Sequence, residues 1–284
     1  MGLRRLLKKA FKKPVQAKDP ILCFKENGCK PWTEGYDEYK WRFITNAIER
    51  NTFCDAIGTE RYGFRIDERA VEYPWLFSKL PDGSGLMLDA GSALNFRTLL
   101  MHDKIRSKRL VIATLAPESQ ACHDLGVSYL YEDLRESVLR DNCFDYISCL
   151  STMEHVGMDN AMLYTNDAAK KENDERSWLF FLDALRARLK AGGKLFLTMP
   201  FGRRKNHGWF QVFDATMVDL LLERFAPAAY SEDVFFYTDD RWNRVDRETA
   251  KDAACFDIHV QKEYEADFLA FSRSVVCLAL QKKQ

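Results

Sequence analysis

The sequence predicts an α/β protein with a mostly parallel β-sheet flanked by helices, and two observations support this prediction. Short apolar segments at 86–89, 109–114, 128–131, 146–150 and 194–199 alternate with segments of helical periodicity. This rhythm is typical of a parallel sheet, because parallel neighbours need a crossover connection. The composition, 46% apolar over 284 residues, is also sufficient for a sizeable core.

The segments around these strands complete the pattern. Helices are predicted at 96–103, 118–125, 177–190 and 215–225, and further strands at 234–237 and 274–280. The aromatic-rich stretch before residue 81 has helical spacing, and a cluster of Pro and Gly at 81–85 separates it from the first strand. We therefore predict three parts: a basic arm at 1–20, an N-terminal helical cap at 21–82 and the core at 83–284.

Charge and cysteine content exclude several classes of function. The chain carries 42 basic and 42 acidic residues, so no net positive charge favours nucleic acid as a partner. Its eight cysteines form no Cys-x-x-Cys pair, so no metal site is predicted. No segment approaches the roughly 20 apolar residues that span a bilayer, and no apolar signal core follows the basic start. We expect a cytoplasmic protein of undetermined oligomeric state.

Residues 2–13 form a distinct basic segment. They include six Lys or Arg and no acid, and four apolar residues recur among them at helical spacing. Two interpretations stay open: an amphipathic helix in peripheral contact with an anionic membrane at its inner face, or a solvated terminus. Leu6 stands where N-myristoylation requires Ser or Thr, which excludes that anchor.

The segment LMLDAGSALNF at 86–96 is the most informative of the chain. An apolar strand ends in Asp89, and Gly91 with small neighbours turns the chain toward a helix. In nicotinamide-binding turns the glycines come first, and the ribose-binding acid follows about 20 residues later. An acid on the first strand itself suits a cationic nucleoside without phosphate, such as S-adenosylmethionine. Ordinary turn chemistry is the alternative explanation.

Candidate functional residues follow the predicted strands, because ligands of open parallel sheets bind beyond the carboxyl ends of the strands. Asp89 and Thr114 end the first two strands, and Asp133 follows the third. The fourth strand is followed by 151–155 and the fifth by 200–214. These positions are therefore expected to meet at one edge of the sheet.

Five of these pieces resemble class I S-adenosylmethionine-dependent methyltransferases of the type 11 kind, over about 86–202. They read LMLDAGS, LVIATLAPES, YEDLRES, FDYISCLSTMEHVG and LKAGGKLFLTMPFG. The most specific part is the strand that begins with FD and ends in an S-x-x-E-H loop, followed by LK-x-GG and a strand ending in Pro. The resemblance implies a Rossmann-like sheet of seven strands, with SRSVVCLALQKK at 272–283 as an antiparallel last strand.

The resemblance also implies roles for single residues. Asp89 and Gly91 would hold the methionine end of S-adenosylmethionine, and Asp133 would accept a hydrogen bond from the adenine amino group. Glu154 and His155 would lie beside the sulfonium or the acceptor. A carboxylate that faces an ammonium or amino donor forms a charge-assisted bond of about 1.5–3 kcal/mol. The full cofactor-binding set implied is Asp89, Ala90, Gly91, Ser92, Thr114, Leu115, Asp133, Leu134 and Ser151.

Two departures from the family pattern concern the cofactor. The motif has three glycines at alternate positions, whereas Ala93 and Asn95 occupy the second and third here. The acid that would bind both ribose hydroxyls at the end of the second strand is replaced by Thr114. Glu118 could reach the ribose from the next segment, or serve only as an acid favoured at a helix N-terminus.

Other candidates also have structural alternatives. Asp133 could cap a turn, and His155 could orient its loop instead of moving a proton. The basic stretch GRRKNHGWFQVFD at 202–214 is either a solvated loop or the acceptor site, and its aromatic residues favour the acceptor site. Arg203, Trp209 and Gln211 are the acceptor-binding candidates in this stretch. His155, Glu154 and His207 are the candidate bases.

The function predicted from these observations is S-adenosylmethionine-dependent O-methylation of a small-molecule or glycan acceptor, as in glycan biosynthesis. The loop typical of amino-directed nucleic-acid methyltransferases does not follow the fourth strand. A non-catalytic binding or scaffold module with the same fold is the alternative. A nicotinamide oxidoreductase is disfavoured by the missing G-x-G-x-x-G and the early position of Asp89.

Overall fold

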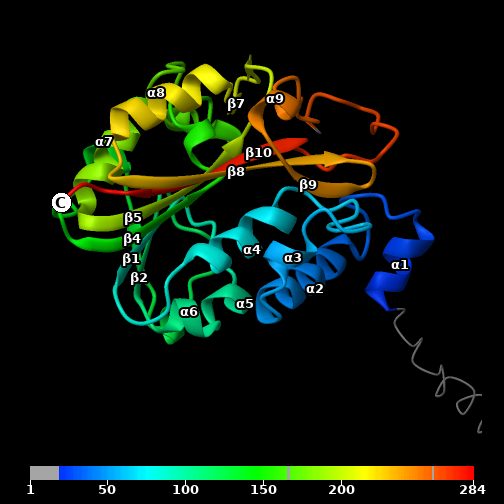
Figure 1. The fold of residues 1–284 in the computed structure, drawn as a ribbon, viewed down its shortest axis with the longest axis horizontal. Helices are drawn as coiled ribbons and strands as arrows, with labels where there is room; N and C mark the ends of the chain where they lie inside the picture. Colours follow the sequence, from blue (N-terminus) through cyan, green and yellow to red (C-terminus); the bar gives the residue numbers. More distant parts are fainter. Residues whose placement is uncertain (1–18, 165–166, 258) are drawn as a thin grey trace, which may run out of the picture.

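The computed structural model describes residues 19–164, 167–257 and 259–284. The predicted basic segment at 2–13 lies outside these ranges. The described chain forms three layers, with helices on both faces of one central sheet (Figure 1). None of the helices within these ranges combines the length and the apolar character needed to cross a bilayer.

The central sheet has eight strands in the order β3-β2-β1-β4-β5-β10-β8-β9. They are β1 (Leu86–Ala90), β2 (Arg109–Thr114), β3 (Ser128–Tyr131), β4 (Phe144–Leu150), β5 (Leu189–Pro200), β8 (Ala229–Thr238), β9 (Arg241–Val245) and β10 (Ser274–Gln281). The first five strands in this order, β3, β2, β1, β4 and β5, are parallel to one another. Strand β10 runs antiparallel to both β5 and β8. This confirms the predicted α/β class and the antiparallel last strand. The edge strand β9, which forms a hairpin with β8, was not predicted.

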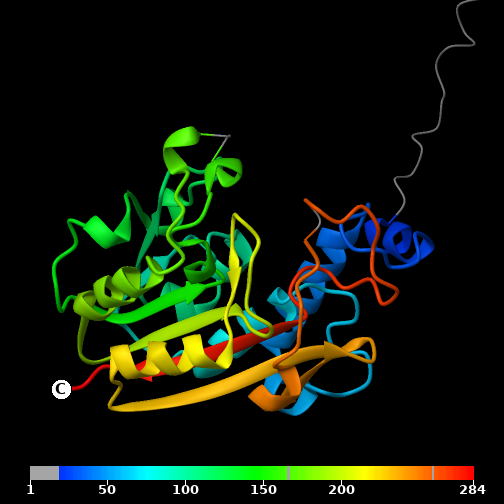
Figure 2. The same ribbon diagram turned by 90° about the horizontal axis from the view of Figure 1, so that it is seen from above.

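Helices α7 and α8 cover one face of the sheet, and α2 to α6 lie on the opposite face (Figure 1). The helices are α1 (Pro20–Glu26), α2 (Tyr36–Glu49), α3 (Phe53–Ala56), α4 (Arg69–Lys79), α5 (Arg97–Leu100), α6 (Asp103–Arg106), α7 (Trp178–Arg188), α8 (Ala215–Phe225) and α9 (Arg247–Ala250). A short hairpin of β6 (Lys205–Asn206) and β7 (Gln211–Val212) projects from the sheet near α8 (Figure 2). Part of the basic stretch at 202–214 is therefore ordered as strands.

Some predicted helices are wrong in extent. The expected helix at 96–103 is divided into α5 and α6, and the expected helix at 118–125 is mostly irregular, with one 3₁₀ turn at His123–Leu125. Tertiary hydrogen bonds replace helical ones there, because the Asn95 side chain donates to both the Glu118 carboxylate and the Gln120 carbonyl. Five of the eight cysteines are buried, whereas Cys54 is exposed and Cys29 and Cys143 are half-buried.

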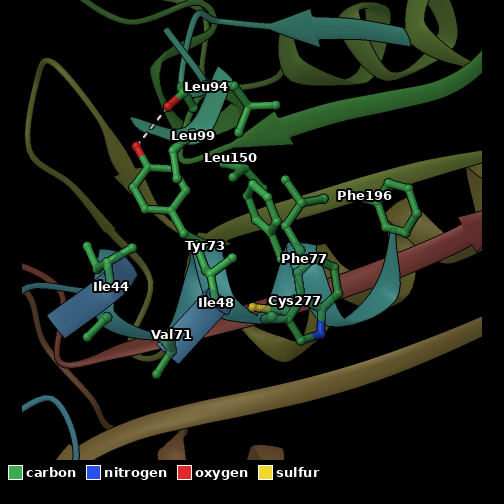
Figure 3. Close-up of a cluster of buried hydrophobic side chains, with 14 of the residues drawn as sticks. Ile44, Ile48, Val71, Tyr73, Phe77, Leu94, Leu99, Leu150, Phe196 and Cys277 are labelled. Carbon is green, nitrogen blue, oxygen red and sulfur yellow. Dashed lines mark hydrogen bonds between the residues drawn. The ribbon is translucent and has the colours of Figure 1, made fainter. Parts of the chain in front are cut away.

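The cap helices share a hydrophobic core with the sheet. Helix α4 places Tyr73 and Phe77 against residues that follow β1 and end β4, among them Leu94, Leu99 and Leu150 (Figure 3). The hydroxyl of Tyr73 donates to the carbonyl oxygen of Ala93 at 2.7 Å, which fixes the helix against the turn after β1 (Figure 3). The helical segment thus positions the loop that the sequence singled out.

Trp75 provides a test of this shared core. It is fully buried on α4, and its indole nitrogen donates to Asp233 of β8 at 2.9 Å. We expect Trp75→Ala to lower the free energy of unfolding by about 3–5 kcal/mol, because burial and packing are lost at the interface of helix and sheet. Urea unfolding followed by far-ultraviolet circular dichroism measures this change.

The matched control is Phe180→Ala on α7, where the side chain is 62% exposed. We expect this variant to stay within about 0.5 kcal/mol of the wild type. If Trp75→Ala were equally mild, or if the cap unfolded in a separate transition, the helices and the sheet would not form one cooperative core.

Candidate functional site

The carboxyl ends of β1 and β4 form the topological switch point of the sheet. From β1 the order continues to β2 and β3 on one side and to β4 and β5 on the other, and such a point is the usual ligand site of an open α/β sheet. Gly91 follows β1 with φ of 105°, and a Cβ atom there would lie 2.1 Å from Oγ1 of Thr152. Only glycine fits this position, because the loops after β1 and β4 come too close for a side chain.

Three cavities adjoin this point. The β3-side cavity, of about 210 Å³, is lined by Thr114, Leu115, Asp133 and Leu134 together with residues that follow β4. The β1-side cavity, of about 600 Å³, lies between α2, α4 and the loops after β1 and β2. The aromatic cavity, of about 290 Å³, includes Trp32, Glu68, Glu154, Trp209 and Phe271.

The three cavities have common walls. Ser151 lines all three, and Gly91 lines both the β3-side and the β1-side cavity. Arg69 lines the β1-side and aromatic cavities, and His155 lines the β3-side and aromatic cavities. The arrangement can therefore hold an elongated ligand across the β3-side and β1-side cavities. The part of that ligand near Ser151 would then lie next to a second ligand in the aromatic cavity.

Asp89 is fully buried and lines none of the three cavities. One carboxylate oxygen accepts the backbone N–H of Leu94 at 2.7 Å, and the other accepts the Ser148 hydroxyl at 2.9 Å. Burial raises the pKa of Asp89 to about 7 despite these two hydrogen bonds. Its observed contacts hold the loop after β1 in shape. The neighbouring Ala90 is likewise buried and outside the cavities.

Asn95, at the third glycine position of the motif, connects the loops after β1 and β2. Its amide nitrogen donates to the Glu118 carboxylate at 2.6 Å, and its amide oxygen accepts the Tyr129 hydroxyl at 2.7 Å. Glu118 lines the β1-side cavity, as does Ser92, whose buried hydroxyl has no protein partner. Asn95 therefore restrains a carboxylate at the cavity wall.

Asp133 lines the β3-side cavity and also caps a turn. Its carboxylate accepts the backbone N–H of Arg135 at 2.8 Å and forms an ion pair with the Arg135 guanidinium. Partial burial acts to raise the pKa of Asp133, but the hydrogen bonds from Arg135 outweigh it, so the pKa is below its usual value. Arg135 is in turn held by Glu172. Asp133 is thus a fixed anion at the cavity wall. It caps a turn, which was one of the two roles considered from the sequence, and it also lies where it could contact a ligand, which was the other.

A second set of site residues comes from the cap and was not predicted. Glu72, fully buried on α4, accepts hydrogen bonds from the Ser151 hydroxyl and the Thr198 hydroxyl, both at 2.5 Å. It also pairs with Arg69 at 2.7 Å. The sequence signal was an unusual one: Asp67, Glu68 and Glu72, together with Arg69, are charged residues within a stretch at 66–77 that is otherwise rich in apolar and aromatic residues.

Two buried carboxyl groups face the aromatic cavity. Glu154 is 1% exposed, and neither of its side-chain oxygens has a protein hydrogen-bond partner. Burial raises its pKa well above the usual value. Glu68 accepts the backbone N–H of Ser272 at 3.2 Å, and burial together with neighbouring carboxylates raises its pKa to about 8.

His155 is oriented by the hairpin that contains Trp209. Its Nδ1 lies 2.9 Å from the carbonyl oxygen of Trp209, and its ring stacks on the indole with centroids 5.2 Å apart. Since a carbonyl only accepts, Nδ1 carries the hydrogen and Nε2 keeps a lone pair. Burial lowers the pKa of His155 to about 4, so the ring is neutral near pH 7.

The other candidates in the stretch 202–214 lie apart from the cavities. Arg203 is exposed and pairs with Asp252, and Gln211 is buried and donates to the Glu175 carbonyl. His207 stacks on Phe210 and lies 3.4 Å from the Asp257 carboxylate. These three residues line none of the three cavities, whereas Trp209 lines the aromatic cavity.

Within the described ranges, no group of three or more His, Cys, Asp or Glu side chains is arranged to hold a metal ion. The polar side chains at the cavities offer hydrogen bonds and charge to an organic ligand.

Comparisons with solved structures return methyltransferases of low sequence identity. The 1,6-didemethyltoxoflavin-N1-methyltransferase of Burkholderia thailandensis is 14% identical over 87% of this chain and 90% of its own, with a TM-score of 0.45. The N-methyltransferase NodS of Bradyrhizobium japonicum is 12% identical, over 87% of this chain and 99% of its own, with a TM-score of 0.43. A possible histamine N-methyltransferase of Thermotoga maritima is 13% identical, over 87% and 95%, with a TM-score of 0.44.

No family model and no curated protein matches the sequence. Because the TM-scores of the solved structures lie below 0.5, the fold assignment rests on the strand order and register of this chain. The sheet is mostly parallel and contains the antiparallel last strand that the sequence resemblance implied, and the structure places this strand between β5 and β8.

The buried state of Asp89 gives a testable pH dependence. Its pKa is about 7 in the folded protein and about 3.9 in an unfolded chain. Between these values the unfolded state has lost a proton that the folded state keeps, so stability falls as pH rises, by up to about 1.4 kcal/mol per pH unit. Above the folded pKa this contribution is constant.

We expect Asp89→Asn to remove this decline, because an amide can accept from Leu94 N–H and donate to the Ser148 hydroxyl. Urea unfolding of both proteins at several values from pH 5 to pH 8 measures the difference, and the contributions of Glu68 and Glu154 cancel in it. Parallel stability profiles for the two proteins would contradict the assigned burial of a titrating Asp89.

Proposed function

We propose that the protein is an S-adenosylmethionine-dependent methyltransferase, with the cofactor across the β3-side and β1-side cavities and the acceptor in the aromatic cavity. The observation that supports this most is the common wall: Gly91 joins the two cofactor cavities, and Ser151 lies at the junction of all three. Bound there, the cofactor supplies an electrophilic methyl group. The chain's main contribution is alignment, for which effective molarities of about 10⁵–10⁸ M are known.

Each end of the cofactor has a chemically suitable partner in this proposal. Asp133 and Leu134 serve the adenine amino group and ring, as the sequence resemblance implied. Arg69, at the wall of the β1-side cavity, suits the α-carboxylate. Gly91 allows close approach of the backbone, and Ser92 offers a buried hydroxyl without a partner. Asp89 then acts indirectly, by holding this loop through Leu94.

For the ribose we propose Glu118 over Thr114. A carboxylate can accept hydrogen bonds from both hydroxyls of the ribose, whereas a single threonine hydroxyl cannot serve both in the same way. The Asn95 amide restrains Glu118 at 2.6 Å, which lowers the entropy cost of using a side chain from an irregular segment. The two departures from the family motif are then physically related.

The acceptor is a small molecule in this proposal, and the sequence favoured a hydroxyl acceptor, including that of a glycan. A hydroxyl needs a base as it is methylated, and the candidates at the aromatic cavity are His155 Nε2 and the carboxylate of Glu154. The alternative of a non-catalytic module predicts cofactor binding without transfer. A screen with methyl-labelled S-adenosylmethionine and fractionated metabolites, lipids and glycans separates the two.

Calorimetric titration of the full chain with S-adenosylhomocysteine tests the cofactor assignment. We expect binding by the wild type and an affinity about 10- to 100-fold lower for Asp133→Ala, because a charge-assisted hydrogen bond to the adenine amino group is lost. The control is Glu136→Ala, an exposed acid of the same turn outside the cavity, which should bind as the wild type does. Equal affinity of all three proteins would place the adenine elsewhere.

The ribose assignment is tested by a double-mutant cycle on ligand and protein. The wild type, Glu118→Ala and Thr114→Val are titrated with S-adenosylhomocysteine and with its 2′-deoxy analogue. In the wild type we expect the analogue to bind roughly tenfold more weakly. In Glu118→Ala this penalty should largely vanish, whereas Thr114→Val should keep it. The reverse pattern would assign the ribose to Thr114.

A further inference from the structure

We propose that the aromatic cavity binds an acceptor through a cationic amine, with Glu154 and Glu68 as counter-charges, and that this amine nitrogen receives the methyl group. This inference rests on the proposed function and narrows the acceptor class from a hydroxyl compound or glycan to an amine.

The first step of the argument is a balance of charges at the cavity wall. Among the described lining residues, Asp67 pairs with Lys40 at 2.9 Å. Arg69 pairs with Glu72 at 2.7 Å, and it forms no ion pair with Glu68 or Glu154. Glu68 and Glu154 remain, and within the described ranges neither takes part in an ion pair with Lys, Arg or His. The wall therefore has a surplus of acidic groups.

The second step concerns Glu154 itself. Buried polar oxygens are nearly always hydrogen-bonded, because a buried group without a partner costs free energy. Both oxygens of Glu154 have no protein partner, although the residue is 1% exposed and lines the cavity. An ammonium is the complementary ligand, since its N–H groups donate to carboxylate oxygens and its charge balances the anion.

The third step concerns the aromatic residues that line the same cavity. Trp32, Trp209 and Phe271 line the cavity, and aromatic faces attract cations. Trp209 is held in place because its indole nitrogen donates to Asp257 at 3.2 Å and its ring stacks on His155. Carboxyl groups and aromatic rings that line one cavity suit an organic ammonium. A metal ion would need a set of ligating side chains, which the described residues do not provide here.

The transfer step balances with these groups. The bound ammonium gives one proton to a carboxylate, and the freed nitrogen lone pair forms the new C–N bond. The methyl–sulfur bond breaks with its electron pair going to sulfur, so the sulfonium becomes a neutral thioether and the nitrogen takes up the positive charge. Ser151 and His155 separate the aromatic cavity from the cofactor cavities, so the nitrogen and the methyl group can meet at this boundary.

The experiment uses a matched pair of probes, benzylammonium and benzyl alcohol, which differ in charge but hardly in shape. Each is titrated calorimetrically into the full chain, with and without saturating S-adenosylhomocysteine. We expect benzylammonium to bind at least tenfold more tightly than benzyl alcohol. In Glu154→Gln this preference should fall to less than threefold, and in Glu68→Gln it should be reduced. Glu136→Gln, which changes an exposed acid outside the cavity, is the control and should keep the preference.

The results distinguish this proposal from the assignment of the cofactor. Glu154→Gln should bind S-adenosylhomocysteine as the wild type does, which also shows that the variant is folded. If its affinity for S-adenosylhomocysteine fell instead, Glu154 would belong to the cofactor site and the amine proposal would be overturned. It would also be overturned if neither probe bound, or if the alcohol bound as tightly as the amine. Absence of S-adenosylhomocysteine binding by the wild type would refute the proposed function and with it the methyl transfer, whereas the probes would still report whether the cavity binds an amine.

Discussion

The carboxylate of Glu72 is the contact on which the geometry of the site depends. It accepts hydrogen bonds from Ser151, after β4, and from Thr198, on β5, and it pairs with Arg69 on its own helix. A buried carboxylate with three donors has a strong preference for one arrangement, because each donor that is lost removes part of the compensation for a buried charge. Glu72 of the cap therefore fixes Ser151, which lines all three cavities. It also fixes the guanidinium of Arg69, which lines the β1-side and aromatic cavities.

The sequence could predict the sheet but not this contact, and the reason is physical. Strand periodicity and breaker residues are local properties, so β1 to β5 and the antiparallel β10 follow from short windows of sequence. Residues after strand ends, such as Thr114 and Asp133, could be placed at one edge for the same reason. The role of Glu72 arises from packing of α4 across the sheet. This packing brings Glu72 into hydrogen-bonding distance of Ser151, which is 79 positions later in the chain, and of Thr198, which is 126 positions later. No local pattern encodes such pairs.

The two departures from the glycine motif have a common structural meaning. With glycine at position 95 the loop after β1 would have no side chain to reach the segment after β2. Asn95 instead connects that loop to Glu118, Gln120 and Tyr129. The irregular path of 118–122, which belongs to the stretch 118–125 that was wrongly expected to be a helix, follows from these bonds. It leaves an acid four positions beyond Thr114, on the wall of the β1-side cavity.

Asp89 and Glu154 illustrate why burial alone does not assign a role to a carboxyl group. Both are buried acids near a strand end, and burial raises the pKa of each. Asp89 has a donor for each oxygen, so its contacts are complete within the fold and account for the shape of the loop. Glu154 has none, so folding leaves its hydrogen-bonding capacity unused at a cavity wall. A polar group of this kind persists at a cost in stability, and a ligand that donates hydrogen bonds and carries positive charge removes that cost when it binds.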